Sequence, residues 1–203
     1  MKIESLIKNE KKVKMKILVF DNYDSFTYNL VQLIKELAPL ASVAVFRNDE
    51  IALEDIKAYD KILLSPGPGV PSESGLLLPL IKEYAASKSI FGVCLGQQAI
   101  GESFGGQLTN LSKVYHGIAT PIALTAPSVL FEGLPKQFNV GRYHSWVVDE
   151  KNFPADLIIT SKDANGFIMS LEHKTYDVKG VQYHPESVLT PDGGKIINNW
   201  LKI

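Results

Sequence analysis

Apolar runs alternate with amphipathic, helix-like stretches along the chain from Met15 onward. In residues 25–37, apolar positions recur three or four residues apart, which is the spacing of one face of a helix. The pattern predicts buried strands at 16–20, 42–46, 61–64 and 89–93, and helices at 25–37, near 53–58, and at about 76–87 and 97–104. Strands that alternate with helices in this way form mostly parallel sheets covered on both faces. The predicted fold class is therefore α/β, with a doubly wound, flavodoxin-like sheet.

The pattern changes at about residue 107, where short β-rich segments separated by turns replace the strand–helix alternation. These segments are predicted at 107–109, 113–124, 138–142, 146–148, 156–161 and 166–171. They indicate a smaller antiparallel β elaboration attached to the parallel core. A strand at 178–183 returns to the core, and a helix at 192–202 closes the fold.

The first fourteen residues are lysine-rich and show no strong hydrophobic period. We interpret residues 1–14 as a mobile N-terminal extension and residues 15–203 as a single domain.

Charge and composition exclude several classes of protein. The 203 residues include 21 Lys and Arg against 22 Asp and Glu, a balance that does not favour nucleic acid or an anionic membrane surface as the main partner. The single cysteine excludes an internal disulfide and fits a reducing compartment, and no segment resembles a signal peptide or membrane span. We therefore expect a cytoplasmic protein. One cysteine and four histidines give no metal-ligand spacing, so no metal site is expected.

The single cysteine lies where chemistry is expected. In Gly92-Val93-Cys94-Leu95-Gly96, an apolar strand runs directly into a cysteine flanked by glycines, and a helix follows. This is the strand-turn-helix elbow that surrounds hydrolase nucleophiles. The positive end of the helix dipole favours the reactive thiolate. Cys94 is therefore a candidate nucleophile, although a lone buried cysteine is more often only a small apolar side chain.

A candidate base follows the last core strand, in Tyr183-His184-Pro185-Glu186-Ser187. His184 could accept the Cys94 proton and later deliver it to a leaving amine. Glu186 is close enough along the chain to hydrogen-bond the far ring nitrogen and fix the tautomer. Because active sites gather at the carboxyl ends of parallel strands, we expect Cys94 and His184 to meet there.

The loop at residues 65–75 is a candidate oxyanion site. Its three prolines and three glycines exclude a helix or an inner strand. Gly67, Pro68 and Gly69 follow a predicted core strand, so a rigid loop with accessible N–H groups should border the nucleophile. The N–H of Leu95, just after the cysteine, is the second candidate donor.

Several motifs together resemble a known family. The segments GVCLGQQ, YHPES and SPGPG are similar to those of class I (triad-type) glutamine amidotransferases. The segments MKILVFDNYDSFTYNL (15–30) and GRYHSWVV (141–148) resemble the glutaminase subunits of anthranilate synthase and aminodeoxychorismate synthase. The resemblance covers residues 15–203.

The resemblance implies a glutaminase in which Cys94, His184 and Glu186 form the triad and Cys94 carries a γ-glutamyl thioester. It implies that Gly67 and Gly69 line the glutamine site. Gln98 would hold glutamine through its side chain, whereas Ser145 and Trp146 would do so through the backbone. The family usually has leucine in place of Trp146, and a lysine in place of Ile118 after His116-Gly117.

The resemblance also implies a partner. Members of the family pass ammonia to a synthase, and this sequence shows no second catalytic domain. We therefore expect a separate synthase subunit that binds chorismate and Mg²⁺, with no cofactor in this chain. Anthranilate synthase is the favoured partner, and aminodeoxychorismate synthase is the alternative.

Other interpretations remain open at this level. The chain could be a stand-alone γ-glutamyl cysteine hydrolase, or a non-catalytic regulatory subunit that keeps the fold. His144, next to Ser145, is a rival base, but neighbouring residues on a strand point to opposite faces, so we favour a positioning or interface role for it.

Overall fold

The computed structural model describes residues 14–203, so the predicted extension at 1–14 lies almost entirely outside it. A single nine-stranded sheet runs through the domain in the order β2-β1-β3-β4-β9-β8-β7-β5-β6. The strands are β1 (Lys16–Asp21), β2 (Ser42–Arg47), β3 (Lys61–Leu64), β4 (Ser89–Val93), β5 (Leu108–Leu124), β6 (Gln137–Val148), β7 (Leu157–Asp163), β8 (Ile168–His173) and β9 (Val178–Val181). The α-helices are α1 (Thr27–Leu37), α2 (Leu77–Tyr84), α3 (Leu95–Ser103) and α4 (Gly193–Leu201), with short 3₁₀ helices at Leu53–Ala58, Pro71–Glu73 and Val129–Phe131.

The strands β2, β1, β3, β4 and β9 form the parallel half of the sheet. Their registers align Leu64 with Gly92 and Gly92 with Gly180, so three strands reach the same edge together. Their carboxyl ends therefore bring together segments that are far apart in sequence.

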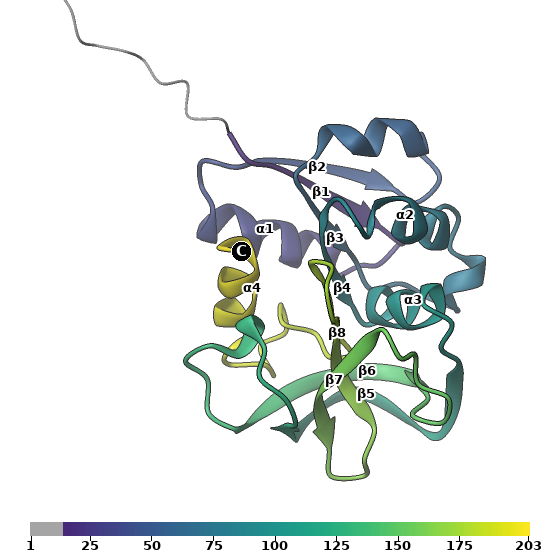
Figure 1. Cartoon of the computed structure of the whole chain (residues 1–203). Helices are drawn as coiled ribbons and strands as arrows, with labels where there is room; N and C mark the ends of the chain where they lie inside the picture. The colour runs from purple at the N-terminus through teal and green to yellow at the C-terminus, as the bar shows by residue number, and fades with distance from the viewer. Residues whose placement is uncertain (1–13) are drawn as a thin grey trace, which may run out of the picture.

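Helices cover both faces of this half, which confirms the doubly wound α/β prediction. Buried residues of α1 and α4 belong to one hydrophobic cluster, and those of α2 and α3 belong to a second. Figure 1 shows α1 beside α4 on one side of the parallel strands and α2 and α3 on the other. Within residues 14–203, no helix is both long and apolar enough to cross a membrane.

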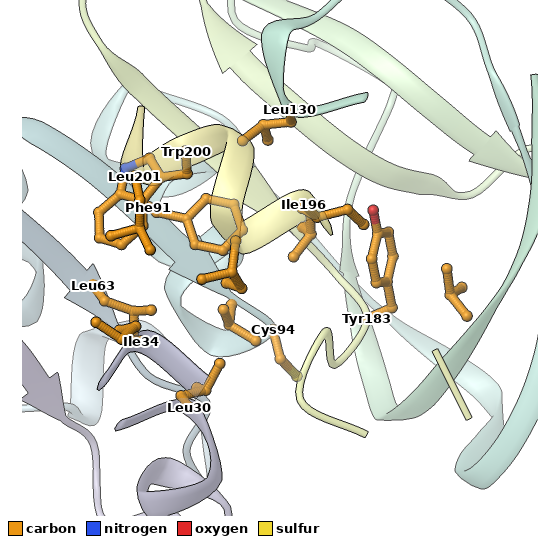
Figure 2. Close-up of a cluster of buried hydrophobic side chains, with 14 of the residues drawn as sticks. Leu30, Ile34, Leu63, Phe91, Cys94, Leu130, Tyr183, Ile196, Trp200 and Leu201 are labelled. Carbon is orange, nitrogen blue, oxygen red and sulfur yellow. The ribbon is translucent and has the colours of Figure 1, made fainter. Parts of the chain in front are cut away.

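The cluster under α1 and α4 also reaches the predicted nucleophile. Phe91 of β4 stacks on the fully buried Trp200 of α4, with ring centroids 5.5 Å apart. Cys94 and Tyr183 belong to the same cluster, and Figure 2 shows both among its labelled side chains. The chemistry is thus anchored in close-packed core rather than in a surface loop.

The antiparallel half is more continuous than the sequence predicts. The segments expected at 107–109 and 113–124 form one strand, β5, and those expected at 138–142 and 146–148 form β6. The β5–β6 register shifts between Asn110 and Tyr115 and again between His116 and Ile118. Extra residues at such irregularities interrupt the alternation of apolar and polar positions, which made each strand look like two.

Candidate active site

Cys94 stands at a sharp turn between β4 and α3. Its backbone has φ 52° and ψ −101°, a conformation that side-chain-bearing residues rarely adopt. Its N–H donates to the Val181 carbonyl at 2.8 Å, and its own carbonyl accepts from Gln98 N at 3.1 Å. The turn is thus held by the neighbouring strand on one side and by the first turn of the helix on the other.

Two glycines let the elbow close this tightly. A Cβ on Gly92 would lie 2.5 Å from the backbone carbon of Gly96, and a Cβ on Gly96 would lie 2.6 Å from the Leu64 carbonyl oxygen. Both distances are too short for real carbon atoms, so any side chain would push α3 away from the sheet. Helix α3 begins at Leu95, earlier than predicted, directly after the cysteine.

His184 and Glu186 form a buried pair beside Cys94. The distance from His184 Nδ1 to Glu186 Oε1 is 2.7 Å, and the two side chains are 3% and 1% exposed. Because Glu186 engages Nδ1, Nε2 is the ring nitrogen left for the cysteine. Burial lowers the pKa of His184, but the adjacent Cys94 and Glu186 outweigh it and raise that pKa to about 10.

Aromatic rings enclose the histidine. Tyr143 packs edge-on against the His184 ring at a centroid distance of 4.9 Å, and Phe26 does so at 6.1 Å. These rings shield the imidazole from water, which strengthens its bond to the carboxylate.

The glycine-rich loop is fixed beside the elbow. Asn22 donates from its backbone N–H to Ser65 Oγ at 2.8 Å and from its side chain to the Ser65 carbonyl at 2.9 Å. A Cβ on Gly67 would lie 2.6 Å from the Asn22 carbonyl oxygen, and Gly69 has φ 72°, so both positions need glycine. The turn that follows β1 therefore holds the loop.

A pocket of about 190 Å³ opens in front of Cys94. It is lined by Gly67, Gly69, Cys94, Gln98, Tyr143, His144, Ser145 and Trp146. Six of these residues were predicted from the sequence, and Tyr143 and His144 join them. Pro68, His184 and Glu186 do not line the pocket, and neither does Leu95, whose side chain is buried in the cluster of α2 and α3.

Gln98 is oriented by two acceptors. Its Nε2 donates to the Trp146 carbonyl at 2.9 Å and to Gln182 Oε1 at 3.2 Å. Because both amide hydrogens are engaged, the Gln98 Oε1 is the atom left to accept a hydrogen bond from a ligand in the pocket.

His144 is held in one neutral form rather than acting as a base. Its Nε2 accepts from Arg142 Nε at 3.1 Å, and its Nδ1 lies 3.0 Å from the Trp146 carbonyl, to which it donates. Burial, together with the charge of Arg142, lowers the pKa of His144 to about 3. Arg142 in turn pairs with Asp163 at 2.6 Å, with both side chains almost wholly buried.

Sequence reasoning missed three residues that shape this site: Tyr143, Arg142 and Gln182. The spacing of Gln182 and His184 offered a clue, because alternate residues of an extended segment share a face. No comparable pattern marked Arg142, whose ion pair joins β6 to the end of β7. Within residues 14–203, no group of three or more His, Cys, Asp or Glu is placed to hold a metal ion.

An α/β sheet with a cysteine at a strained elbow beside a buried histidine–carboxylate pair is the arrangement expected of triad-type cysteine enzymes. The family model for class-I glutamine amidotransferases matches residues 18–203. This chain belongs to that family.

Three curated relatives illustrate the similarity. The chain is 45% identical over 193 residues to anthranilate synthase component 2 of Pseudomonas aeruginosa, covering 92% of this chain and 94% of the relative. It is 44% identical over 187 residues to aminodeoxychorismate synthase component 2 of Escherichia coli, covering 91% and 98%. It is also 44% identical to the bifunctional protein TrpGD of Thermotoga maritima, covering 94% of this chain but only 33% of that longer protein.

A solved structure shares the fold. The crystal structure of a protein assigned to GMP synthase as one of its subunits, from Thermoplasma acidophilum, superposes with a TM-score of 0.83 at 26% identity, covering 93% of both chains. The parallel core and the antiparallel elaboration are thus features of the family.

Proposed function

We propose that this chain hydrolyses L-glutamine to glutamate and ammonia with Cys94, His184 and Glu186 as its catalytic triad, and supplies the ammonia to a chorismate-using synthase subunit. The observation that carries the proposal is the buried His184–Glu186 pair, joined at 2.7 Å, beside a cysteine at a strained elbow. A structural cysteine would need neither the strain nor the pair.

The first half of the reaction forms a thioester. His184 takes the proton of the Cys94 thiol, and the thiolate attacks the carboxamide carbon of glutamine to give a tetrahedral oxyanion. Backbone N–H groups of Leu95 and of the loop at Gly69 are the candidate donors to that oxyanion. Imidazolium then returns the proton to the leaving nitrogen, the C–N bond breaks, and ammonia departs.

The second half releases glutamate. A water molecule gives one proton to His184, and its oxygen attacks the thioester carbon. Collapse of the tetrahedral intermediate breaks the C–S bond and regenerates the Cys94 thiol with the proton from His184. Glu186 stays ionised and stabilises each imidazolium.

Glutamine recognition follows from the pocket. Gln98 presents Oε1, an acceptor suited to an amino or amide N–H of the substrate. The Trp146 carbonyl already accepts two hydrogen bonds, from Gln98 and His144. A backbone contact with glutamine would therefore use the Trp146 N–H or the backbone of Ser145. Such contacts do not depend on the Trp146 side chain, which differs from the usual leucine.

The partner assignment draws on the relatives. Those named above include a component of anthranilate synthase and a component of aminodeoxychorismate synthase, at 45% and 44% identity. Anthranilate synthase is our first choice and aminodeoxychorismate synthase the second, since the identities barely separate them. Chorismate and Mg²⁺ would bind to the synthase subunit. Relatives that are synthase components disfavour a stand-alone γ-glutamyl hydrolase.

The proposal is tested by replacing the nucleophile. Cys94→Ala should lower glutamine-dependent product formation by the reconstituted synthase complex on the order of 10³-fold or more, as removal of a catalytic nucleophile does. Ammonia-dependent synthesis by the same complex should persist, because ammonia bypasses this site. Loss of both activities would refute ammonia delivery.

The base is tested separately. His184→Ala should slow glutamine hydrolysis and thioester formation to a similar degree, with His173→Ala, on the far hairpin, as the matched histidine control. Unchanged glutamine turnover in His184→Ala would exclude the triad assignment.

A further inference from the structure

The sulfur of Cys94 has a neighbour besides His184. The side chain of Gln182 is fully buried, and its Nε2 lies 3.5 Å from Cys94 Sγ, within range of a hydrogen bond to sulfur. Gln182 follows the end of β9, the strand that pairs with the cysteine-bearing β4. The contact therefore spans the seam between the two strands that carry the chemistry.

The hydrogen-bond network fixes which end of the Gln182 amide faces the sulfur. Gln182 Oε1 accepts from Gln98 Nε2 at 3.2 Å, and Gln98 also donates to the Trp146 carbonyl. If the Gln182 amide were reversed, two NH₂ groups would face each other. The NH₂ group of Gln182 must therefore point at Cys94.

A donor in this position affects the two states of the cysteine differently. A hydrogen bond to an ionised acceptor is roughly twice as strong as one between neutral groups, and burial strengthens it further. The Gln182 N–H thus stabilises a Cys94 thiolate more than the thiol, and it restrains the sulfur on the side of the pocket.

We propose that Gln182 is a positioning residue of this active site, which holds the Cys94 sulfur through its N–H and orients Gln98 through its carbonyl. One side chain then couples the nucleophile to the residue that receives the substrate. The inference rests on the proposed role of Cys94 as nucleophile.

Two variants separate the two contacts. Gln182→Met removes both the donor and the acceptor at nearly constant length. Gln182→Glu keeps an acceptor for Gln98 but offers the sulfur a carboxylate in place of an N–H. Gln97→Met is the matched control, since Gln97 is equally buried and its amide has no hydrogen-bond partner within residues 14–203.

The first measurement is the rate of iodoacetamide labelling against pH. Cys94 is the only cysteine, so the labelling reports that sulfur alone. Both Gln182 variants should shift the midpoint of labelling upward by about one pH unit, the size expected for loss of a hydrogen bond to a charged group. Gln97→Met should keep the wild-type midpoint.

The second measurement is the steady-state hydrolysis of glutamine. Both Gln182 variants should lower kcat about tenfold or more. KM should rise about fivefold in Gln182→Met, which frees Gln98, but stay within about twofold of wild type in Gln182→Glu. A merely structural role would not divide kcat from KM in this way.

Wild-type midpoints in folded Gln182 variants would overturn the inference. If Gln182→Met fails to fold, Gln182→Glu decides alone, because it retains the shape and the bond to Gln98. Labelling needs no glutamine, so failure of this inference is distinct from failure of the proposed function, which would appear as a wild-type protein that does not hydrolyse glutamine.

Discussion

Both ring nitrogens of His144 are occupied, and this single residue determines where the Trp146 carbonyl lies. Arg142 donates to one nitrogen, and the other donates to that carbonyl. The carbonyl in turn fixes Gln98. A histidine that is locked neutral thus acts as a structural spacer on the wall of the pocket, behind the residues that meet the substrate.

The lowered pKa of His144 predicts sensitivity to acid. In the unfolded chain this imidazole takes up a proton near pH 6.5, whereas in the folded protein it does so only near pH 3. The unfolded state therefore binds more protons between these values, and the free energy of unfolding should fall as the pH drops through that window. The loss amounts to at most ~1.4 kcal/mol per pH unit from this residue.

His144→Gln removes the titrating group, so its stability should depend less steeply on pH than that of wild type. Urea unfolding at several pH values between 7 and 4 measures this difference. His116→Gln, at an exposed position, serves as the control and should keep the wild-type slope. An equally steep slope in His144→Gln would show that other groups account for the acid sensitivity.

Local pattern identified the residues of the elbow but not those that support it. Cys94, His184 and Glu186 stand in short motifs next to strand ends, where sequence and chemistry coincide. Arg142, Asp163 and Gln182 act through partners distant in the chain, and an ion pair between β6 and the end of β7 leaves no trace in the local spacing. Supporting residues of this kind need the tertiary structure.

At the level of elements, the parallel half was predictable because its strands are buried on both faces and read as continuous apolar runs. Strands β3 (61–64) and β4 (89–93) match their predicted bounds. The antiparallel strands β5 and β6 were each predicted as two pieces, since register shifts break their alternation. The position of β9 beside β4 follows from long-range pairing that no local pattern encodes.

The close contact between α3 and the sheet yields a prediction about Gly96. Gly96→Ala would place a methyl group against the Leu64 backbone, so the free energy of unfolding should fall by about 1–3 kcal/mol, as overpacking does. Shifting α3 would also move Leu95 and Gln98, and glutamine hydrolysis should decline. Chemical denaturation and an activity assay measure the two effects.

Gly194→Ala is the matched control, because the nearest atom to a Cβ there is 3.7 Å away. In helix α4 this change should be neutral or stabilise by up to about 1 kcal/mol. If Gly96→Ala were as stable and as active as Gly194→Ala, close packing at the elbow would not be needed.

At the scale of the whole molecule, the choice between two synthases remains for experiment. We expect the synthase subunit of anthranilate synthase from the same organism to co-purify with this chain and to raise its rate of glutamine hydrolysis. The corresponding subunit of aminodeoxychorismate synthase is the comparison. Pull-down followed by a glutaminase assay measures both properties. Binding and activation by the aminodeoxychorismate synthase partner only would reverse the assignment, and full turnover without either partner would favour a stand-alone hydrolase.

The pocket is assembled from two separate blocks of sequence. The reactive atoms come from the ends of β4 and β9, whereas Tyr143, Ser145 and Trp146 come from β6 in the antiparallel half. Bond breaking and substrate selection are thereby assigned to different parts of the chain. Substitutions in β6 could exchange one amide for another while every reacting group keeps its place, so the same scaffold can acquire a new preference without relearning its chemistry.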